Sequence, residues 1–188
     1  MKKKDITIEM IEEAGYMPYP SNDPYKTIWS KPKTWMAGPV EHSHNGKWLR
    51  PVESKHGYWD VILMVNGKRY RFAIHRLVAM KYMGIQSDQY VDHINHDKSD
   101  SRIENLRIAT ISQNGGNRLK QRDASSKYKG VSWRMSDKVW QVSIMLNKKA
   151  KYLGRFNSEI EAARAYDEAA LKHFKDYAYL NFPEESVI

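Results

Sequence analysis

The residues best suited to chemistry are a histidine and three oxygen-bearing side chains between residues 92 and 114. Asp92 and His93 are adjacent, and Asn105 and Asn114 follow them. Phosphodiester hydrolysis needs a base that activates water and a hard cation that neutralises the charge developing on the phosphate. An imidazole suits the first task because its unperturbed pKa is about 6.5. Carboxylate and amide oxygens suit the second, since Mg²⁺ prefers oxygen ligands and keeps several waters.

The elements around these residues determine whether they can meet. Residues 89–94 and 106–109 are expected to form two short strands joined by a polar loop. Thr110 or Ser112 can cap a helix that follows and carries Asn114. This strand–loop–strand–helix order would bring Asp92 and Asn114 together. The spacing alone does not distinguish such a site from a polar loop.

Upstream, local patterns predict a hairpin and a helix. Asn66-Gly67 separates two β-rich segments, residues 58–65 and 69–74, which predicts a two-residue turn. Residues 75–83 are expected to form a helix that ends at a glycine. Residues 1–56 are expected to be an irregular extension with one short helix, because four prolines interrupt residues 16–33.

The charge is concentrated in one segment. Residues 1–117 carry 17 basic and 13 acidic side chains, a net charge of +4. Residues 118–155 carry 11 basic and 2 acidic side chains, a net charge of +9, and residues 156–188 carry 3 and 7, a net charge of −4. The net charge of the middle segment therefore equals the net charge of the whole chain. Such a concentration favours contact with phosphates, and a solvated basic face is the alternative.

The composition limits the class of protein. The chain has 188 residues, 41% of them hydrophobic, and no cysteine. Disulfides and zinc sites built on thiolates are therefore excluded. A signal-peptide core and an apolar run of membrane-spanning length are missing from the sequence. We expect an intracellular basic protein of one or two small domains.

The C-terminal third has the pattern of a small sheet and a helix. Residues 119–126 are polar and basic, which is typical of a linker. Beyond them, hydrophobic and polar residues alternate from Trp140 to Asn147, as in a strand with one buried face. Ser158 and Glu161 form a capping-box pattern that opens an alanine-rich helix. Three strands and one helix are expected.

Four segments of the sequence together resemble a known family. They are HRLVA from residue 75, VDHIN from residue 91, ENLRIAT from residue 104, and the dipeptide Gln113-Asn114. In this order they closely resemble the HNH endonucleases of phage and intron homing elements. The resemblance covers roughly residues 57–118 and implies a ββα-metal fold.

The resemblance also implies roles for the four residues. His93 would be the general base that deprotonates the attacking water, and Asn105 would position His93 and close the hairpin. Asp92 and Asn114 would hold one divalent ion, Mg²⁺ or Mn²⁺, against the scissile phosphate, and no zinc is expected. The implied products are a 5′-phosphate and a 3′-hydroxyl. His75 is interpreted as a structural residue of the family's helix.

A second resemblance covers residues 126–183. Its segments are YKGVSWR from residue 128, YLGRF from residue 152, EAARAYDEAA from residue 161 and NFP from residue 181. They strongly resemble the plant ethylene-response-factor (Apetala-type) DNA-binding domain. The resemblance implies that the sheet enters the major groove while the helix supports its far side.

Residues on the outward face of this sheet are the candidates for DNA contact. Arginine to guanine and glutamine to adenine are the usual direct base contacts, whereas lysines more often contact phosphates. The candidates are Lys129, Ser132, Arg134, Gln141, Ser143, Met145, Lys151 and Tyr152. A solvated sheet surface is the alternative interpretation.

These observations predict an α+β chain in four parts: an extension (1–56), an HNH nuclease domain (57–118), a basic linker (119–126) and a DNA-binding domain (127–188). The predicted function is a metal-dependent, site-directed DNA endonuclease. Double-stranded DNA is the expected partner, without a membrane or a small-molecule cofactor, for a monomer or homodimer in the cytoplasm of a bacterial or phage-infected cell. The alternatives are a sequence-specific DNA-binding regulator with an inactive nuclease fold, and an RNA-directed protein.

Overall fold

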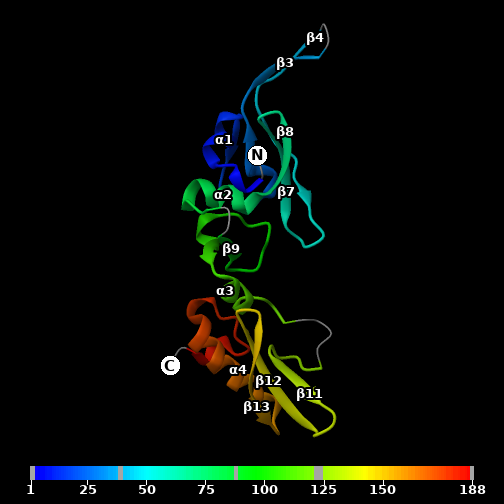
Figure 1. Ribbon diagram of the computed structural model, residues 1–188, viewed down its shortest axis with the longest axis vertical. Coiled ribbons are helices and arrows are strands. Elements are labelled where there is room, and N and C mark those ends of the chain that lie inside the picture. Colours follow the sequence, from blue (N-terminus) through cyan, green and yellow to red (C-terminus); the bar gives the residue numbers. More distant parts are fainter. Residues whose placement is uncertain (1–2, 38–39, 87–88, 121–124, 187–188) are drawn as a thin grey trace. The chain divides into compact units, whose positions relative to one another are not determined.

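The computed structural model describes residues 3–37, 40–86, 89–120 and 125–186. It divides into two compact units, residues 1–108 and 109–188 (Figure 1). Both helices and sheets are present, as the predicted α+β class requires. Among the described residues, the helices are too short or too polar to cross a membrane.

The first 56 residues contain more regular structure than the prolines led us to expect. The helix α1 (Ile8–Glu13) is capped by Thr7, whose side chain accepts a hydrogen bond from the Met10 amide. Short strands follow: β1 (Tyr16–Pro18), β2 (Ile28–Ser30) and β5 (Lys47–Trp48) form one sheet, and β3 (Lys33–Ala37) pairs with β4 (Val40–His44). Short 3-10 helices lie at Lys3–Asp5 and Pro24–Lys26.

This N-terminal segment packs into the core of the first unit. Ile11 and Ile28 are fully buried against Leu63 and Val65. Strands of three residues are too short to show a hydrophobic period, and Pro18 ends one of them, so the sequence patterns did not reveal the sheet. Residues 1–56 therefore form part of the first unit's core and sheets.

The predicted hairpin is confirmed. Strand β6 (Val52–Glu53) pairs with β7 (Trp59–Val65), which pairs antiparallel with β8 (Lys68–Ala73). Asn66 and Gly67 form the turn with φ values of 49° and 72°, as a two-residue turn with both φ angles positive requires. Alternate residues of β7 are buried, so this strand lies with one face on the core.

The segment that carries the candidate chemistry follows directly. Helix α2 (Ile74–Met83) ends at Gly84, which has a left-handed φ of 63°. Strand β9 (Tyr90–His93) pairs with β10 (Leu106–Ala109), and the 3-10 helix Ile103–Asn105 precedes β10. Val91 and Leu106 pack with α2 in a second core cluster, which holds the end of β9 against the helix.

The second unit combines a three-stranded sheet with two helices. Helix α3 (Ile111–Gly116) opens with a capping box between Thr110 and Gln113. Strands β11 (Val131–Arg134), β12 (Val139–Leu146) and β13 (Lys149–Phe156) form an antiparallel sheet, and α4 (Glu159–Phe174) follows. Short 3-10 helices at Lys175–Tyr177 and Pro183–Ser186 end the chain's described part.

One face of this sheet carries the unit's core. Val142 and Ile144 of β12 are buried together with Ala162, Ala163 and Tyr166 of α4. The small alanines allow the helix backbone to approach the sheet closely. Along β12, Val142 and Ile144 are buried, whereas Ser143 is half-buried and Met145 is exposed, as expected of a strand with one buried face.

The boundary between the units differs from the predicted linker at residues 119–126. The structure divides at residue 108, ten residues before that linker begins. The reason is that α3 packs on β12 and α4. Residues 121–124 of the predicted linker lie outside the described residues.

Candidate active site and nucleic-acid interface

Asp92 and His93 end strand β9 in a buried position. Their exposed fractions are 6% and 5%. A buried carboxylate next to a buried imidazole is costly unless the charged group is paired. Such a pair of titratable groups inside a unit is a physical indication of a functional site.

Two other rings surround His93. The centroid of the His75 ring lies 4.8 Å from that of His93 in an edge-on arrangement, and Tyr58 lies 5.2 Å from His75 and 6.1 Å from His93. Burial lowers the pKa of His93, and the charges of Asp92 and Asp97 oppose that shift. The imidazole is therefore neutral at neutral pH, which is the form that accepts a proton.

His75 is held in its neutral form even more firmly. Burial, together with the charges of His93 and Arg76, lowers the pKa of His75 to about 3. Its neutral ring packs against His93 without bringing a positive charge next to it. The sequence indicated a structural residue at this position, and its contact with the candidate base could not be seen from spacing.

Arg107 pairs with the carboxylate of Asp92. Its Nε and one terminal nitrogen each lie 2.9 Å from Oδ2 of Asp92. Arg107 lies on β10, the partner strand of β9, so the pairing of the strands sets this contact. The ion pair fixes the orientation of the carboxylate inside the unit. Arg107 lies in one of the sequence motifs, but the motif alone indicated no role for it.

Asn105 ties the two ends of the loop that follows His93. Its Oδ1 accepts the Asn95 amide at 2.9 Å, its Nδ2 donates to the Asp100 carbonyl at 2.9 Å, and its own carbonyl accepts the Ile94 amide at 2.9 Å. The Asn105 side chain is buried. These three bonds fix the backbone directly after His93.

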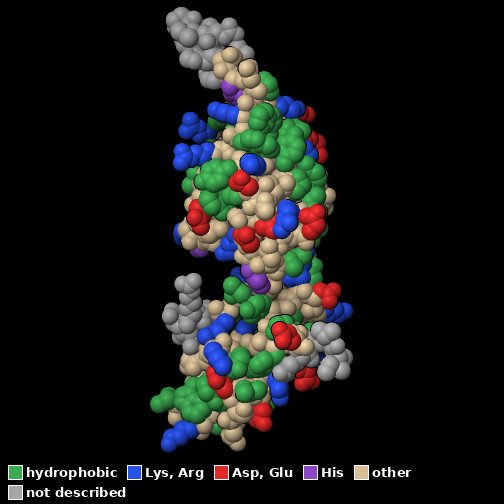
Figure 2. All heavy atoms as spheres, turned by 180° about the vertical axis from the view of Figure 1, so that it is seen from behind, with side chains coloured by type: hydrophobic (Ala, Val, Ile, Leu, Met, Phe, Trp, Pro, Cys, Tyr) green, Lys and Arg blue, Asp and Glu red, His purple; other side chains and the backbone are tan. Residues whose placement is uncertain are grey.

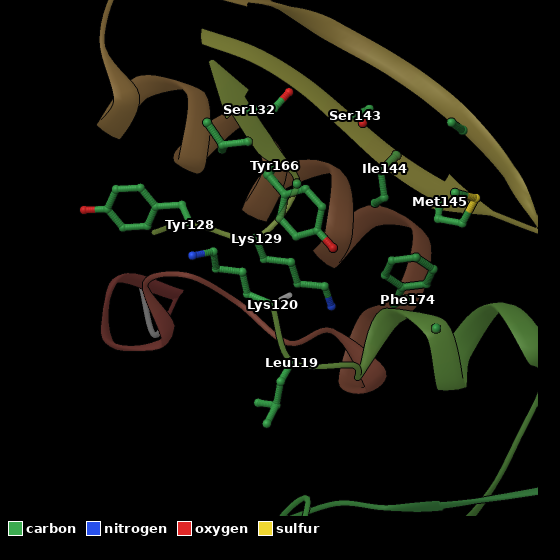
Figure 3. Close-up of a pocket in the computed structure, with 14 residues that line it drawn as sticks. Leu119, Lys120, Tyr128, Lys129, Ser132, Ser143, Ile144, Met145, Tyr166 and Phe174 are labelled. Carbon is green, nitrogen blue, oxygen red and sulfur yellow. The ribbon is translucent and has the colours of Figure 1, made fainter. Parts of the chain in front are cut away.

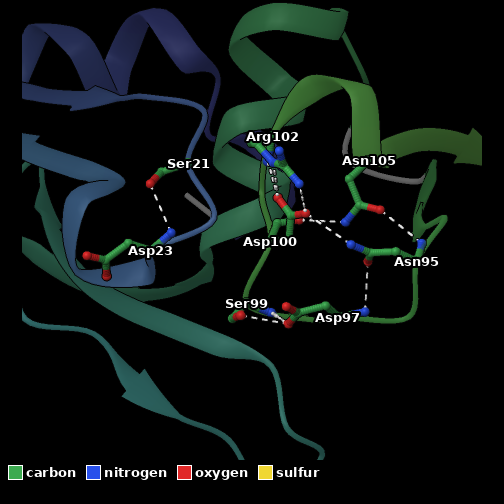
Figure 4. A network of polar contacts seen from close by, with 8 residues as sticks. All are labelled: Ser21, Asp23, Asn95, Asp97, Ser99, Asp100, Arg102 and Asn105. Atoms are coloured by element: carbon green, nitrogen blue, oxygen red, sulfur yellow. Dashed lines mark hydrogen bonds and ion pairs between the residues drawn. The ribbon is translucent and has the colours of Figure 1, made fainter.

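Asp100 is the centre of the polar network in this loop (Figure 4). Its carboxylate is 2% exposed and accepts Nδ2 of Asn95 at 3.0 Å. The Arg102 guanidinium binds both of its oxygens, at 2.9 and 2.8 Å. These hydrogen bonds, chiefly from Arg102, hold the pKa of Asp100 below its usual range. Asp97 in the same loop is exposed and bonds to Ser99 at 2.9 Å.

The donor set suits a hard cation held mainly by water and phosphate. Among the described residues, no three His, Asp or Glu side chains converge as in an all-protein metal cage. Mg²⁺ is commonly bound by one or two carboxylates together with phosphate oxygens. Asp92 is a carboxylate that could serve in this way, and the absence of cysteine from the sequence excludes a thiolate site for zinc.

The four predicted residues of the active site fall in both units. Asp92, His93 and Asn105 are brought together at the end of β9 in the first unit. Asn114 lies on α3 in the second unit, half-buried, with its amide bonded to the Thr110 carbonyl at 2.9 Å. Its assignment as a metal ligand therefore rests on the sequence motif.

The strand register defines the outward face of the C-terminal sheet. Ser132 is paired with Gln141, Gln141 with Arg155, and Ser143 with Tyr152. Directly paired residues share a face, so these side chains form rows on the side away from α4. Arg155 lies in the same row as Ser132 and Gln141, and the sequence did not identify it as a candidate. Figure 2 shows basic and hydrophobic side chains interspersed on one face of each unit.

The candidates at the strand ends and on β13 differ in their placement. Arg134, Met145 and Tyr152 are exposed, as a surface that meets DNA requires. Arg134 Nε lies 3.3 Å from Asp137 Oδ2. Lys151 is exposed but is paired with Ile144, so it lies on the face that bears the core rather than on the predicted outward face.

Lys129 points into the second unit, which also differs from the predicted outward placement. Its ammonium donates to the Gly116 carbonyl, and its amide donates to Oδ1 of Asn181 at 2.7 Å. Burial lowers the pKa of Lys129 to about 8, and the charge of Asp167 opposes that shift. The side chain is therefore engaged inside this unit, where it stabilises the fold, and does not lie on the outward face.

The segment around β9 is similar to a known protein family. Residues 72–115 match the family model described as HNH endonuclease. This segment of the chain is therefore similar to the HNH endonuclease family. The matched segment includes Asp92, His93, Asn105 and Asn114, so the resemblance that the order of motifs suggested is confirmed.

Relatives of both parts are found. The chain is 35% identical over 97 residues to an uncharacterized HNH endonuclease, L560, of Acanthamoeba polyphaga mimivirus, which covers 52% of this chain and 49% of that protein. Its C-terminal part is similar to APETALA2-like protein 2 of Oryza sativa subsp. japonica, with 32% identity over 116 residues, 57% of this chain and 25% of that protein. The chain thus spans about half or less of the length of these relatives.

A solved structure is also similar to part of the chain. It is described as DNA binding and cleavage by the HNH homing endonuclease I-HmuI. The TM-score is 0.40 at 26% identity, covering 53% of this chain and 50% of that chain.

Proposed function

We propose that this protein is a metal-dependent endonuclease that hydrolyses phosphodiester bonds in double-stranded DNA, with the C-terminal sheet docking on the target. The observation that carries the proposal is the neutral, buried His93 beside the paired carboxylate of Asp92, inside the segment that matches the HNH family. A neutral imidazole and a fixed carboxylate are the two groups that the reaction requires.

The residues of the chain would act as follows. The imidazole of His93 takes a proton from water, whose oxygen then forms a bond to phosphorus as the bond to the 3′ oxygen breaks. The 3′ oxygen leaves and takes a proton from solvent water to become a hydroxyl, and the phosphate stays on the 5′ side. Asp92 and Asn114 would hold the divalent ion, which supplies positive charge to the phosphate and the leaving oxygen. Arg107 orients the carboxylate of Asp92, and Asn105 fixes the loop after His93.

The C-terminal sheet would supply the specificity that this site lacks. A one-metal site contacts little more than a phosphate, so recognition of sequence must come from another surface. The row of Ser132, Gln141 and Arg155 presents hydrogen-bonding groups of the kinds that read base edges. The net charge of +9 in residues 118–155 favours the phosphate contacts that hold this surface on DNA.

Supercoiled plasmid DNA tests the proposal. We expect the purified chain to nick or linearise it in Mg²⁺ or Mn²⁺, and to leave it intact in EDTA. The Asp92→Asn variant should lose cleavage. The Asp97→Asn variant, which changes an exposed carboxylate in the neighbouring loop, should keep it. Binding without cleavage in every metal would instead support a DNA-binding regulator with an inactive nuclease fold, and cleavage confined to single-stranded RNA would support an RNA-directed enzyme.

A further inference from the structure

The helix that carries Asn114 is built into the C-terminal unit. Helix α3 packs against both β12 and α4. The Tyr179 amide donates to the Gly116 carbonyl at 3.1 Å, and the Asn147 amide, in the turn between β12 and β13, donates to Ser112 Oγ at 3.3 Å. All of these residues belong to the second unit. Helix α3 is therefore attached near both of its ends to the sheet and helix that we expect to dock on DNA.

A close contact at Gly116 fixes the position of α3. A Cβ atom at Gly116 would lie 2.5 Å from Cγ of Phe174, so the helix can approach this ring only because the residue is glycine. Phe174 is 3% exposed and belongs to the core of the unit. In Figure 3 its ring lies between α4 and α3. The ring thus acts as a fixed surface against which the last turn of α3 is set.

Lys129 forms a second attachment at the same place. Its ammonium donates to the Gly116 carbonyl and lies 5.7 Å from the ring centre of Tyr166 and 5.5 Å from that of Tyr179. The last carbonyls of a helix have no partner within the helix, so a buried lysine that binds one of them stabilises its end. Figure 3 shows this side chain extending toward α3.

Helix α3 cannot hold its own orientation. It has six residues, and isolated helices shorter than about 12 residues are marginal in water. Its geometry must therefore come from its contacts with the rest of the second unit. Phe174 also lines a cleft of about 340 Å³ together with Lys129 and Tyr166, beside the last turn of α3.

We propose that the C-terminal unit positions Asn114 in addition to docking on DNA, with Phe174 and Lys129 as the positioning residues. The inference rests on the proposed function, in which Asn114 is a metal ligand. The docking module then forms part of the cutting machinery, because disturbing the contact between Phe174 and Gly116 moves Asn114 without removing any group that binds DNA or metal.

Two neighbouring glycines provide a matched pair of variants. Gly116→Ala places a methyl group against the Phe174 ring, whereas Gly115→Ala meets nothing within 4 Å. Both substitutions favour the helix equally by removing backbone freedom. We expect Gly116→Ala to lower the single-turnover rate of plasmid cleavage by about 10- to 100-fold and to raise the Mn²⁺ concentration needed for half-maximal cleavage. Gly115→Ala should cleave like the unchanged protein.

Binding and rescue separate positioning from general damage. In a gel shift with a fragment of the same plasmid, Gly116→Ala should keep its affinity for DNA within a few-fold. Gly116→Ala combined with Phe174→Leu, whose smaller side chain makes room for the methyl group, should recover part of the lost rate. Equal cleavage by the two alanine variants, or a loss of cleavage no larger than the loss of binding, would overturn the proposal.

Lys129→Met is a second test of the proposal, which remains available if Gly116→Ala does not fold. Methionine keeps the aliphatic packing and removes the donor to Gly116, so cleavage should fall more than binding. If Lys129→Met reduces both equally, the positioning role is wrong.

Hydrogen exchange of the full chain gives a readout that does not depend on activity. The amides of Asn114 and Asn117, which donate to Thr110 and Gln113, should exchange faster in Gly116→Ala than in Gly115→Ala. Equal exchange would overturn the anchoring of α3. Failure of the unchanged protein to cleave DNA in Mg²⁺ and Mn²⁺ would refute the proposed function, while the exchange result would still decide whether the C-terminal unit holds α3.

Discussion

At the scale of single residues, the ion pair between Asp92 and Arg107 is the interaction on which the site most depends. The Arg107 side chain is 16% exposed and that of Asp92 is 7% exposed. Removing one partner of a buried pair leaves the other charged and unpaired. We expect Arg107→Met to lower the free energy of unfolding by about 3 kcal/mol, measured by urea unfolding, and to lower cleavage with it.

Arg71 provides the control for this prediction. It pairs with Asp60 at 2.7 Å, but its side chain is 54% exposed. Exposed pairs contribute little because water screens them, so Arg71→Met should cost less than about 1 kcal/mol. Equal losses for the two variants would show that the pair at Asp92 is not protected from solvent.

His75 should make stability depend on pH. Its pKa is about 3 in the folded protein and about 6.5 in the unfolded chain. Between these values the unfolded chain binds a proton that the folded protein does not, so the free energy of unfolding falls as the pH falls. From about pH 7.5 to about pH 5 this single group should remove about 2 kcal/mol.

His75→Phe tests the pH prediction because it keeps a ring against Tyr58 and His93 and cannot titrate. Urea unfolding at the two pH values should show that the free energy of unfolding falls by about 2 kcal/mol less in the variant than in the unchanged protein. The same loss in both proteins would mean that His75 is not the source of the pH dependence.

The sequence motif identified the residue types of the site, but their electrostatic states needed the structure. Asp92, His93 and Asn105 stand out because their order is specific to a family. The low pKa of His75 and the pairing of Asp92 with Arg107 depend on burial and on residues that are distant in sequence. Spacing along a chain carries no information on either.

At the scale of elements, the loop between β9 and β10 owes its shape to Asp100. The carboxylate joins Asn95 to Arg102, and its backbone carbonyl accepts from Asn105. Asp100→Ala leaves Asn95 and Arg102 without their acceptor, which we expect to cost about 2 kcal/mol of stability and to slow cleavage by loosening the backbone after His93. Thermal unfolding and plasmid cleavage measure the two effects.

Asp97→Ala is the matched control in the same loop. Asp97 is exposed and its carboxylate accepts hydrogen bonds from the neighbouring Ser99, so removing it should change stability by less than about 0.5 kcal/mol. If Asp97→Ala is as harmful as Asp100→Ala, the loop depends on its total charge and not on the buried network.

The elements that the sequence predicted well are those with a local physical cause. The turn at Asn66-Gly67, the alternation along β12 and the start of α4 after Ser158 each follow from a few neighbouring residues. The three-residue strand β1 and the packing of α3 on the second unit were not predicted. Both depend on contacts with residues far along the chain.

At the scale of the whole molecule, the uneven charge should determine how salt affects DNA binding. Lys148 and Lys149 lie at the turn between β12 and β13, in the segment of net charge +9, whereas Lys172 and Lys175 lie in the segment of net charge −4. Each phosphate contact that is lost reduces the slope of log K against log salt by about 0.9.

Double variants test this prediction with closely matched backbones. Lys148 and Lys175 both have positive φ values, 65° and 50°. We expect Lys148→Gln with Lys149→Gln to make the salt dependence less steep by about 2, and Lys172→Gln with Lys175→Gln to leave it unchanged. Fluorescence anisotropy over a range of salt gives the slopes, and equal slopes would place the DNA elsewhere.

The central claim is that His93 is the base of a DNA-cutting site, and one comparison tests it most directly. His93→Ala and His56→Ala each remove one imidazole, the second from an exposed position. Single-turnover cleavage of plasmid DNA in Mg²⁺ should be lost in His93→Ala and kept in His56→Ala, while both variants bind the DNA with the affinity of the unchanged protein. Cleavage by purified His93→Ala at the full rate would contradict the account.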